Sequence, residues 1–210
     1  MNGKRLIGWM LVIGVIVLIG SFFVEPSSSG SGEMFAKTGA AIVSAPDQSN
    51  VANALALVGM ILMLLGLAYY AQRNQGGAQP DIVNIASSLA FVSVAIAAAA
   101  LAVSSGISWK EVAAEHHLVL YTVSETMFMG VFSLVALSLI LLAVGLFRQQ
   151  TTLLLKASWG VVALVGLSLA AGVSGLTDAS AVAEVVEIIG FMGLPFVFIV
   201  LGVRTIRSSE

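Results

Sequence analysis

Cysteine is absent from this chain of 210 residues, and charged residues make up only 10% of it. Without cysteine the chain can form no disulfide, iron–sulfur cluster or thiolate metal site. A soluble domain carries about 25% charged residues, because its surface must stay hydrated. The scarcity of charge therefore argues against a soluble globular protein. The small net charge of −2 gives no reason to expect nucleic-acid binding.

Apolar residues, in contrast, are abundant and make up 59% of the chain. One membrane-spanning helix needs about 20 apolar residues, so six would use about 120 positions, close to the 124 or so that 59% of 210 represents. The apolar runs are continuous, whereas strands of a membrane barrel alternate in hydrophobicity. We therefore predict an all-α membrane protein, a single membrane domain built as a bundle of six transmembrane helices. The predicted spans are 6–24, 52–72, 82–104, 117–147, 153–175 and 181–203, with an outer loop at 25–51.

The basic residues predict how the chain is oriented. With six spans both termini lie on one side, and seven of the nine basic residues fall on that side. The positive-inside rule assigns the side rich in lysine and arginine to the cytoplasm. We therefore predict a multi-pass protein of the cell inner (plasma) membrane with cytoplasmic N- and C-termini. The basic residues on this side are Lys4, Arg5, Arg73, Arg148, Lys156, Arg204 and Arg207.

Ionisable residues inside a bilayer are candidates for function, because burying them in lipid is costly. Their depth follows from the helical rise of about 1.5 Å per residue, counted from the arginine at the inner end of each span. Glu125 lies about 34 Å from Arg148 and Glu184 about 30 Å from Arg204, which places both at the outer boundary of a core about 30 Å thick. Glu187 lies about 26 Å from Arg204 and is the most deeply placed carboxylate.

Two outer helix ends combine these carboxylates with a histidine and a tyrosine. On span 117–147, His117, Tyr121 and Glu125 share one broad face, because helical residues advance by about 100° each. On span 181–203, Glu184 and Glu187 are three residues apart and also share a face. These five residues form the predicted ligand- or ion-binding site.

Several ligands suit this set of side chains. Carboxylates with imidazole suit Zn, Mn, Fe or Cu, and the same residues can relay protons or bind a cationic ligand. The alternative without a function is that they are solvated charges at helix ends, where acidic residues stabilise a helix N-terminus. The sequence identifies no particular metal or cofactor.

Catalytic motifs are missing from the sequence. The chain holds only two histidines, and these are adjacent, so a haem held by two histidines of this chain is not expected. No Gly-rich phosphate loop, Ser-His-Asp order or His-Glu-x-x-His motif occurs. We therefore assign no catalytic residue and expect a protein that is not an enzyme.

Helix packing is predicted from small residues and proline. Span 82–104 contains the run 95–100 of alanine and isoleucine, and span 153–175 is rich in glycine and alanine. Small residues let helix backbones approach closely in lipid, so we expect these two spans to lie centrally. Pro195, in the middle of span 181–203, is expected to kink that helix and to free the carbonyl of Phe191.

The second half of the chain resembles a family of uncharacterised six-helix bacterial integral membrane proteins, known only as a domain of unknown function. The resemblance rests on His117, Tyr121, the helix from Met129 to Arg148, the stretch from Lys156 to Gly166 and the ending Leu201-Gly202-Val203-Arg204. It covers about half of the chain. The inner turn 149–153 lacks the Gly and Pro of the family pattern, and the first half has no clear match. The resemblance implies a fold rather than an activity.

The sequence leads to two hypotheses about function. The first is a small, non-enzymatic polytopic membrane protein that senses or handles an ion or small ligand at its outer face. The alternative is an accessory or structural subunit of a larger membrane complex of respiratory, photosynthetic or oxygenase type. The expected partners are the lipid bilayer and either other membrane subunits or further copies of the chain, with no nucleic acid.

Overall fold

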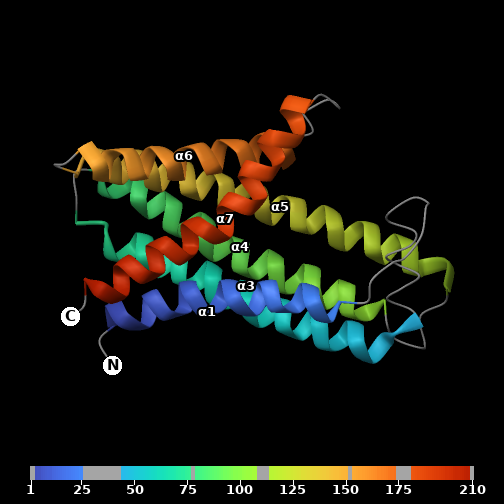
Figure 1. The fold of residues 1–210 in the computed structure, drawn as a ribbon. Coiled ribbons are helices and arrows are strands. Elements are labelled where there is room, and N and C mark those ends of the chain that lie inside the picture. Colours follow the sequence, from blue (N-terminus) through green and yellow to red (C-terminus); the bar gives the residue numbers. More distant parts are fainter. Residues whose placement is uncertain are drawn as a thin grey trace.

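The computed structural model describes residues 3–25, 44–76, 79–107, 114–150, 153–173 and 181–208. Every regular element in these ranges is an α-helix, which confirms the predicted all-α class (Figure 1). The six helices are α1 (Gly3–Val24), α3 (Pro46–Arg73), α4 (Pro80–Gly106), α5 (Ala114–Phe147), α6 (Leu153–Val173) and α7 (Ala181–Arg207).

Five of these helices, α1, α3, α4, α5 and α7, contain stretches long and apolar enough to cross a membrane. The apolar stretch described in α6, Lys156–Gly172, is shorter. The chain therefore has the make-up of a multi-pass membrane protein, and a sixth span remains a prediction. The helix bounds follow the predicted spans closely, except that α3 begins at Pro46 rather than at 52, inside the segment predicted as outer loop.

Proline and aspartate explain where two of the helices begin. Pro46 and Pro80 stand at the first positions of α3 and α4, where a missing backbone N–H costs no hydrogen bond. Asp47 and Asp81 follow them, and a negative charge in the first turn is favoured by the helix dipole. The Gln48 side chain also donates a hydrogen bond of 2.8 Å to the carbonyl of Val24, which joins the start of α3 to the end of α1.

The six helices form a closed ring. Each packs against its neighbours along the chain, and α7 completes the ring by packing against α1. Figure 1 shows α5 and α6 on one side, α1 and α3 on the other, and α7 crossing from α6 to α1. The start of α1 and the end of α7 lie together at one end of the bundle, which we call the terminal end, and the opposite end is the far end.

Paired glycines set two of the helix crossings. A methyl group added to Gly14 of α1 would lie 2.9 Å from the carbonyl oxygen of Gly59 in α3, and one added to Gly59 would lie 2.9 Å from that of Gly14. In the same way, a methyl group on Gly8 of α1 would lie 2.7 Å from the carbonyl oxygen of Gly202 in α7. The backbones are therefore in direct contact, the close packing that stabilises helices where lipid removes any hydrophobic driving force.

Serine hydroxyls add hydrogen bonds between helices in the bundle interior. Each donates to a carbonyl of a neighbouring helix rather than of its own, so that buried hydroxyls are satisfied. The bonds are Ser87 to Ala68 (3.0 Å), Ser138 to Ala86 (2.8 Å) and Ser124 to Ala100 (3.1 Å), and they join α4 to α3 and α5 to α4.

The expectation that two spans lie centrally is wrong. In a ring each helix packs mainly against two others, so α4 and α6 are no more central than the rest. Some small residues of α4 do lie at helix contacts, since Ala86, Ala90 and Ala97 are fully buried. Ala95 and Ala99 are exposed, so small size alone predicts neither the buried face of a helix nor how many neighbours the helix has.

Helix α7 holds two different partners along its length. Near its middle, Gly190 and Gly193 press against Leu169 and Val165 of α6, and nearer its end Gly202 presses against Gly8 of α1. The helix runs without a break through Pro195 and changes direction along its course (Figure 1). This path brings α7 across from α6 to α1, so that α6 and α7 diverge toward the terminal end.

Candidate ligand cavity at the far end

A cavity of about 190 Å³ opens among α1, α3, α4 and α5 at the far end of the bundle. Its apolar walls come from all four helices, and its polar side chains gather where α1 ends and α5 begins. The polar lining residues are Ser21, Glu25, Asn53, Ser104, Tyr121 and Glu125, and the larger apolar ones are Leu18, Phe22, Met60, Leu101, Phe128 and Phe132.

Two carboxylates and a phenol form the polar centre of this cavity. Glu125 is half-buried on α5. Its side chain is hydrogen-bonded to that of Tyr121, one helical turn earlier, and interacts electrostatically with Glu25. Because like charges repel, two carboxylates in one small cavity create a site that favours a cation or a shared proton.

Glu25 lies just beyond the end of α1 and is exposed. Desolvation by the neighbouring protein atoms raises the pKa of its carboxyl above the ordinary value of 4.5. A carboxyl whose ionised form is poorly solvated gains more from a bound cation than one surrounded by water.

Serine and asparagine side chains supply neutral oxygen atoms to the cavity. The Ser104 hydroxyl of α4 donates a hydrogen bond of 3.4 Å to the amide oxygen of Asn53 in α3. The Ser21 hydroxyl bonds to the carbonyl of Leu18 in its own helix at 2.7 Å. The polar groups of the cavity are thus held in place by bonds within and between helices.

The structure brings together two of the five predicted site residues. Tyr121 and Glu125 line the cavity, as their shared helical face predicts. His117 is half-buried on α5 and does not line it. Glu184 and Glu187 belong to α7, but their side chains lie outside the described residues, so their part in a site stays a prediction.

Sequence reasoning missed Glu25, Asn53 and Ser104. Glu25 looks like an ordinary loop charge, because it directly follows the first span and precedes a run of serine and glycine. Its position at a helix end, at the same predicted depth as Glu125, is the signal that was available. Asn53 and Ser104 have no such signal, because only the packing of α3 against α4 places them together.

The composition of the cavity bears on what it can hold. Among the described residues, no group of three or more His, Asp or Glu side chains is arranged to hold a metal ion. The cavity instead joins two carboxylates to the aromatic rings of Phe22, Phe128 and Phe132. Carboxylates and aromatic faces both attract an organic cation.

Comparison of the chain with family models, curated proteins and solved structures found no match. The resemblance of the second half to a six-helix family therefore stays a prediction.

Proposed function

We propose that this protein is a non-enzymatic, multi-pass membrane protein that binds a small cationic ligand in the cavity at the far end. The observation that carries the proposal is the meeting of Glu25 and Glu125 in one cavity, with Tyr121 hydrogen-bonded to Glu125. Ligand pockets are commonly apolar with a few well-placed polar groups that fix orientation, and this cavity has that character.

The ligand class that suits the cavity best is a small organic amine. An ammonium group can donate hydrogen bonds to both carboxylates and to the amide oxygen of Asn53, while its carbon atoms contact the phenylalanine rings. A metal ion would find only two carboxylates among the described lining residues. This difference favours the amine over Zn, Mn, Fe or Cu.

The orientation follows from the same charges that define the two ends. We place the terminal end on the cytoplasmic side of the cell inner (plasma) membrane, because this end carries Lys4, Arg73 and Arg204. The cavity then opens at the outer face, so its ligand comes from outside the cytoplasmic membrane. All six helices span the bilayer in this arrangement, α6 included.

Binding of butylammonium to the purified protein in mild detergent tests the proposal, with 1-butanol as the uncharged analogue. We expect calorimetry to detect butylammonium binding and no butanol binding. Glu125→Gln keeps the shape of the side chain but removes its charge, and it should weaken binding by at least about tenfold, equivalent to 1.4 kcal/mol. The matched control is the corresponding change of acid to amide at Asp47, an exposed residue at the same end that does not line the cavity. Asp47→Asn should leave butylammonium binding unchanged.

Two results would contradict this assignment. If the Glu125→Gln variant bound butylammonium as tightly as the unchanged protein, the cavity would not be the binding site. Binding of Ca²⁺ or Mn²⁺ but not of butylammonium, abolished in the same variant, would replace the amine with a metal ion.

The alternative function, an accessory subunit of a larger membrane complex, stays a prediction from the sequence. Purification in gentle detergent followed by mass spectrometry distinguishes it from the proposal, because a subunit should bring defined protein partners with it.

A further inference from the structure

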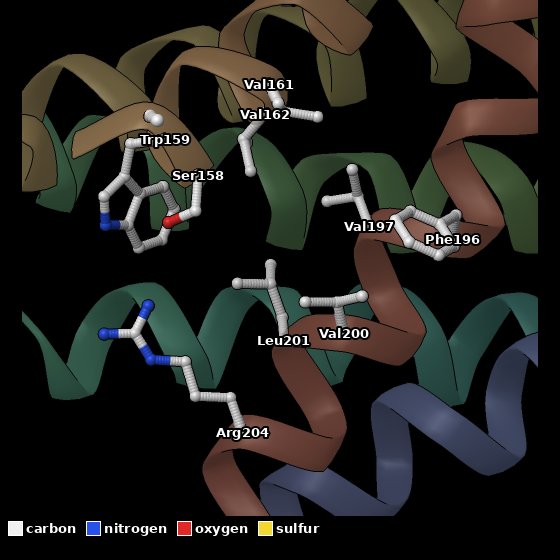
Figure 2. Close-up of a pocket in the computed structure, with 10 residues that line it drawn as sticks. Ser158, Trp159, Val161, Val162, Phe196, Val197, Val200, Leu201 and Arg204 are labelled. Atoms are coloured by element: carbon white, nitrogen blue, oxygen red, sulfur yellow. The ribbon is translucent and has the colours of Figure 1, made fainter. Parts of the chain in front are cut away.

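An apolar groove lies between α6 and α7 on the half of the bundle near the terminal end. Its volume is about 510 Å³, within the range of roughly 300–1,000 Å³ that is usual for ligand pockets. It exists because α7 leaves α6 after Gly193 and reaches α1 at Gly202. Val161 and Val162 of α6 face Phe196, Val197, Val200 and Leu201 of α7 across this opening (Figure 2).

The groove opens onto the surface that faces lipid. Phe196 is 64% exposed, and Val161 and Val200 are each about half exposed. From Phe196 to Arg204 the groove follows α7 for about 12 Å, at 1.5 Å per residue. This length is close to one leaflet of a hydrocarbon core about 30 Å thick, so the groove matches the depth of an acyl chain.

Basic residues gather at the end of this groove. Arg204 lines the groove and also a second, polar cavity of about 280 Å³, in which it is joined by Lys4 of α1 and Arg73 of α3. The other polar lining residues of this second cavity are Tyr70, Asn74, Thr205 and Ser208, and none of its described lining residues is acidic. Three cations from three helices therefore line one concavity, and Arg204 is shared between this concavity and the apolar groove.

An unsatisfied donor lies at the same end. Trp159 of α6 lines the groove and is only 2% exposed, and its indole nitrogen has no hydrogen-bond acceptor among the described residues. Figure 2 shows this nitrogen and the guanidinium group of Arg204 toward the same end of the opening, the first on α6 and the second on α7. Leaving a buried donor unpaired costs free energy. An oxygen atom that entered this end of the groove, after a shift of the surrounding side chains, would therefore gain a hydrogen bond from the indole nitrogen.

We propose that an anionic phospholipid binds here, with one acyl chain in the groove between α6 and α7 and its phosphate in the basic cavity. Charge complementarity selects this occupant over a zwitterionic lipid or an apolar protein segment. An apolar segment would place no negative charge beside Arg73 and Arg204, and a zwitterionic lipid would bring a second positive charge to them. Basic pockets between membrane helices bind anionic headgroups by the same electrostatics.

Quenching of Trp159 fluorescence by lipids with brominated acyl chains tests this inference. The chain has three tryptophans, so the variant Trp9→Phe with Trp109→Phe leaves Trp159 as the only one. In bilayers of phosphatidylcholine, brominated phosphatidylglycerol should quench Trp159 at a several-fold lower mole fraction than brominated phosphatidylcholine with the same chains. Equal quenching by the two lipids would overturn the proposal.

Three further experiments test separately the headgroup site, the acyl-chain groove and the binding of a free anion. Arg204→Gln in the single-tryptophan protein should lower the preference for phosphatidylglycerol roughly fivefold, the factor for about 1 kcal/mol per basic residue, whereas Arg148→Gln at the same end should not. Val161→Phe adds bulk to an exposed groove position and should abolish the preference while far-ultraviolet circular dichroism stays unchanged. If Arg204→Gln keeps the preference for phosphatidylglycerol, the proposed headgroup site is wrong. If Val161→Phe keeps it, the proposed acyl-chain groove is wrong. Competition by millimolar glycerol phosphate would show a site for free phosphate and overturn the lipid.

Discussion

Single glycines decide how closely the helices approach. Gly14 and Gly59 bring the backbones of α1 and α3 into contact, and Leu11, one turn before Gly14, fills the space beside Gly66. Any side chain at the first two positions must push against backbone atoms, which cannot move away as a flexible side chain can. The same helix contains Gly20, where an added methyl group would have no described atom of another helix within 4 Å.

The pair Gly14 and Gly20 therefore gives a matched test in one helix. Gly14→Ala places a methyl group 2.5 Å from the amide nitrogen of Met63 and should lower the free energy of unfolding by about 1–3 kcal/mol, the usual effect of overpacking. Gly20→Ala should be neutral or stabilising by up to about 1 kcal/mol, because alanine favours the helix more than glycine does. Unfolding of the purified protein in dodecyl sulfate measures both, and equal effects would contradict the glycine crossing.

The raised pKa of Glu25 predicts how stability depends on pH. A carboxyl whose pKa is higher in the folded state than the unfolded value near 4.5 stabilises the fold below that value, and this contribution is lost as the pH rises through the folded pKa. Glu25→Gln should therefore raise the melting temperature at pH 7 relative to the unchanged protein, and the difference should vanish near pH 4. A difference of the same size at both pH values would show that ionisation of Glu25 is not the cause.

At the scale of elements, serine residues show how one residue type serves two purposes. Ser138 is buried and donates to Ala86 in the neighbouring helix α4, whereas Ser133, also on α5, is exposed and donates to Met129 in its own helix. Only the first bond holds two helices together. The sequence cannot tell them apart, because both follow the same apolar pattern within one span.

Replacing each serine by alanine separates these two uses. Ser138→Ala should lower the free energy of unfolding by about 0.6 kcal/mol, the average for hydrogen bonds between membrane helices. Ser133→Ala should have no measurable effect, since its bond lies within one helix on an exposed surface. Measurement uses the same dodecyl sulfate unfolding, and an effect of Ser133→Ala as large as that of Ser138→Ala would contradict the assignment.

On the scale of the whole molecule, closure of the ring gives the two ends different characters. The far end receives Glu25 and Glu125 in one cavity, and the terminal end receives Lys4, Arg73 and Arg204 in another. Both cavities join residues from helices that are distant in the chain, so each depends on the ring being closed. The contact of α1 with α7 is what brings Lys4 to Arg204.

This asymmetry predicts which end faces the cytoplasm. Since the chain has no cysteine, single cysteines can be introduced freely. Asp47→Cys, exposed at the far end, should react with a membrane-impermeant maleimide on intact cells. Gly76→Cys, exposed in the turn after α3 at the terminal end, should react only after the membrane is opened. The reverse pattern would contradict cytoplasmic termini.

The sequence alone determined the helical class, the approximate helix bounds and the separation of basic from acidic ends. These properties depend on local composition, because a helix in lipid satisfies its own backbone and needs only enough apolar residues. It also placed Tyr121 and Glu125 on one helix face, since helical geometry is local.

The tertiary structure alone decided which helices are neighbours. Lipid offers no hydrophobic drive between helices, so their order depends on close backbone packing at glycines such as Gly8 and Gly202 and not on a polar–apolar pattern. Hence only the ring could show that Glu25 shares a cavity with Glu125, and that Arg204 stands between an apolar groove and two further cations.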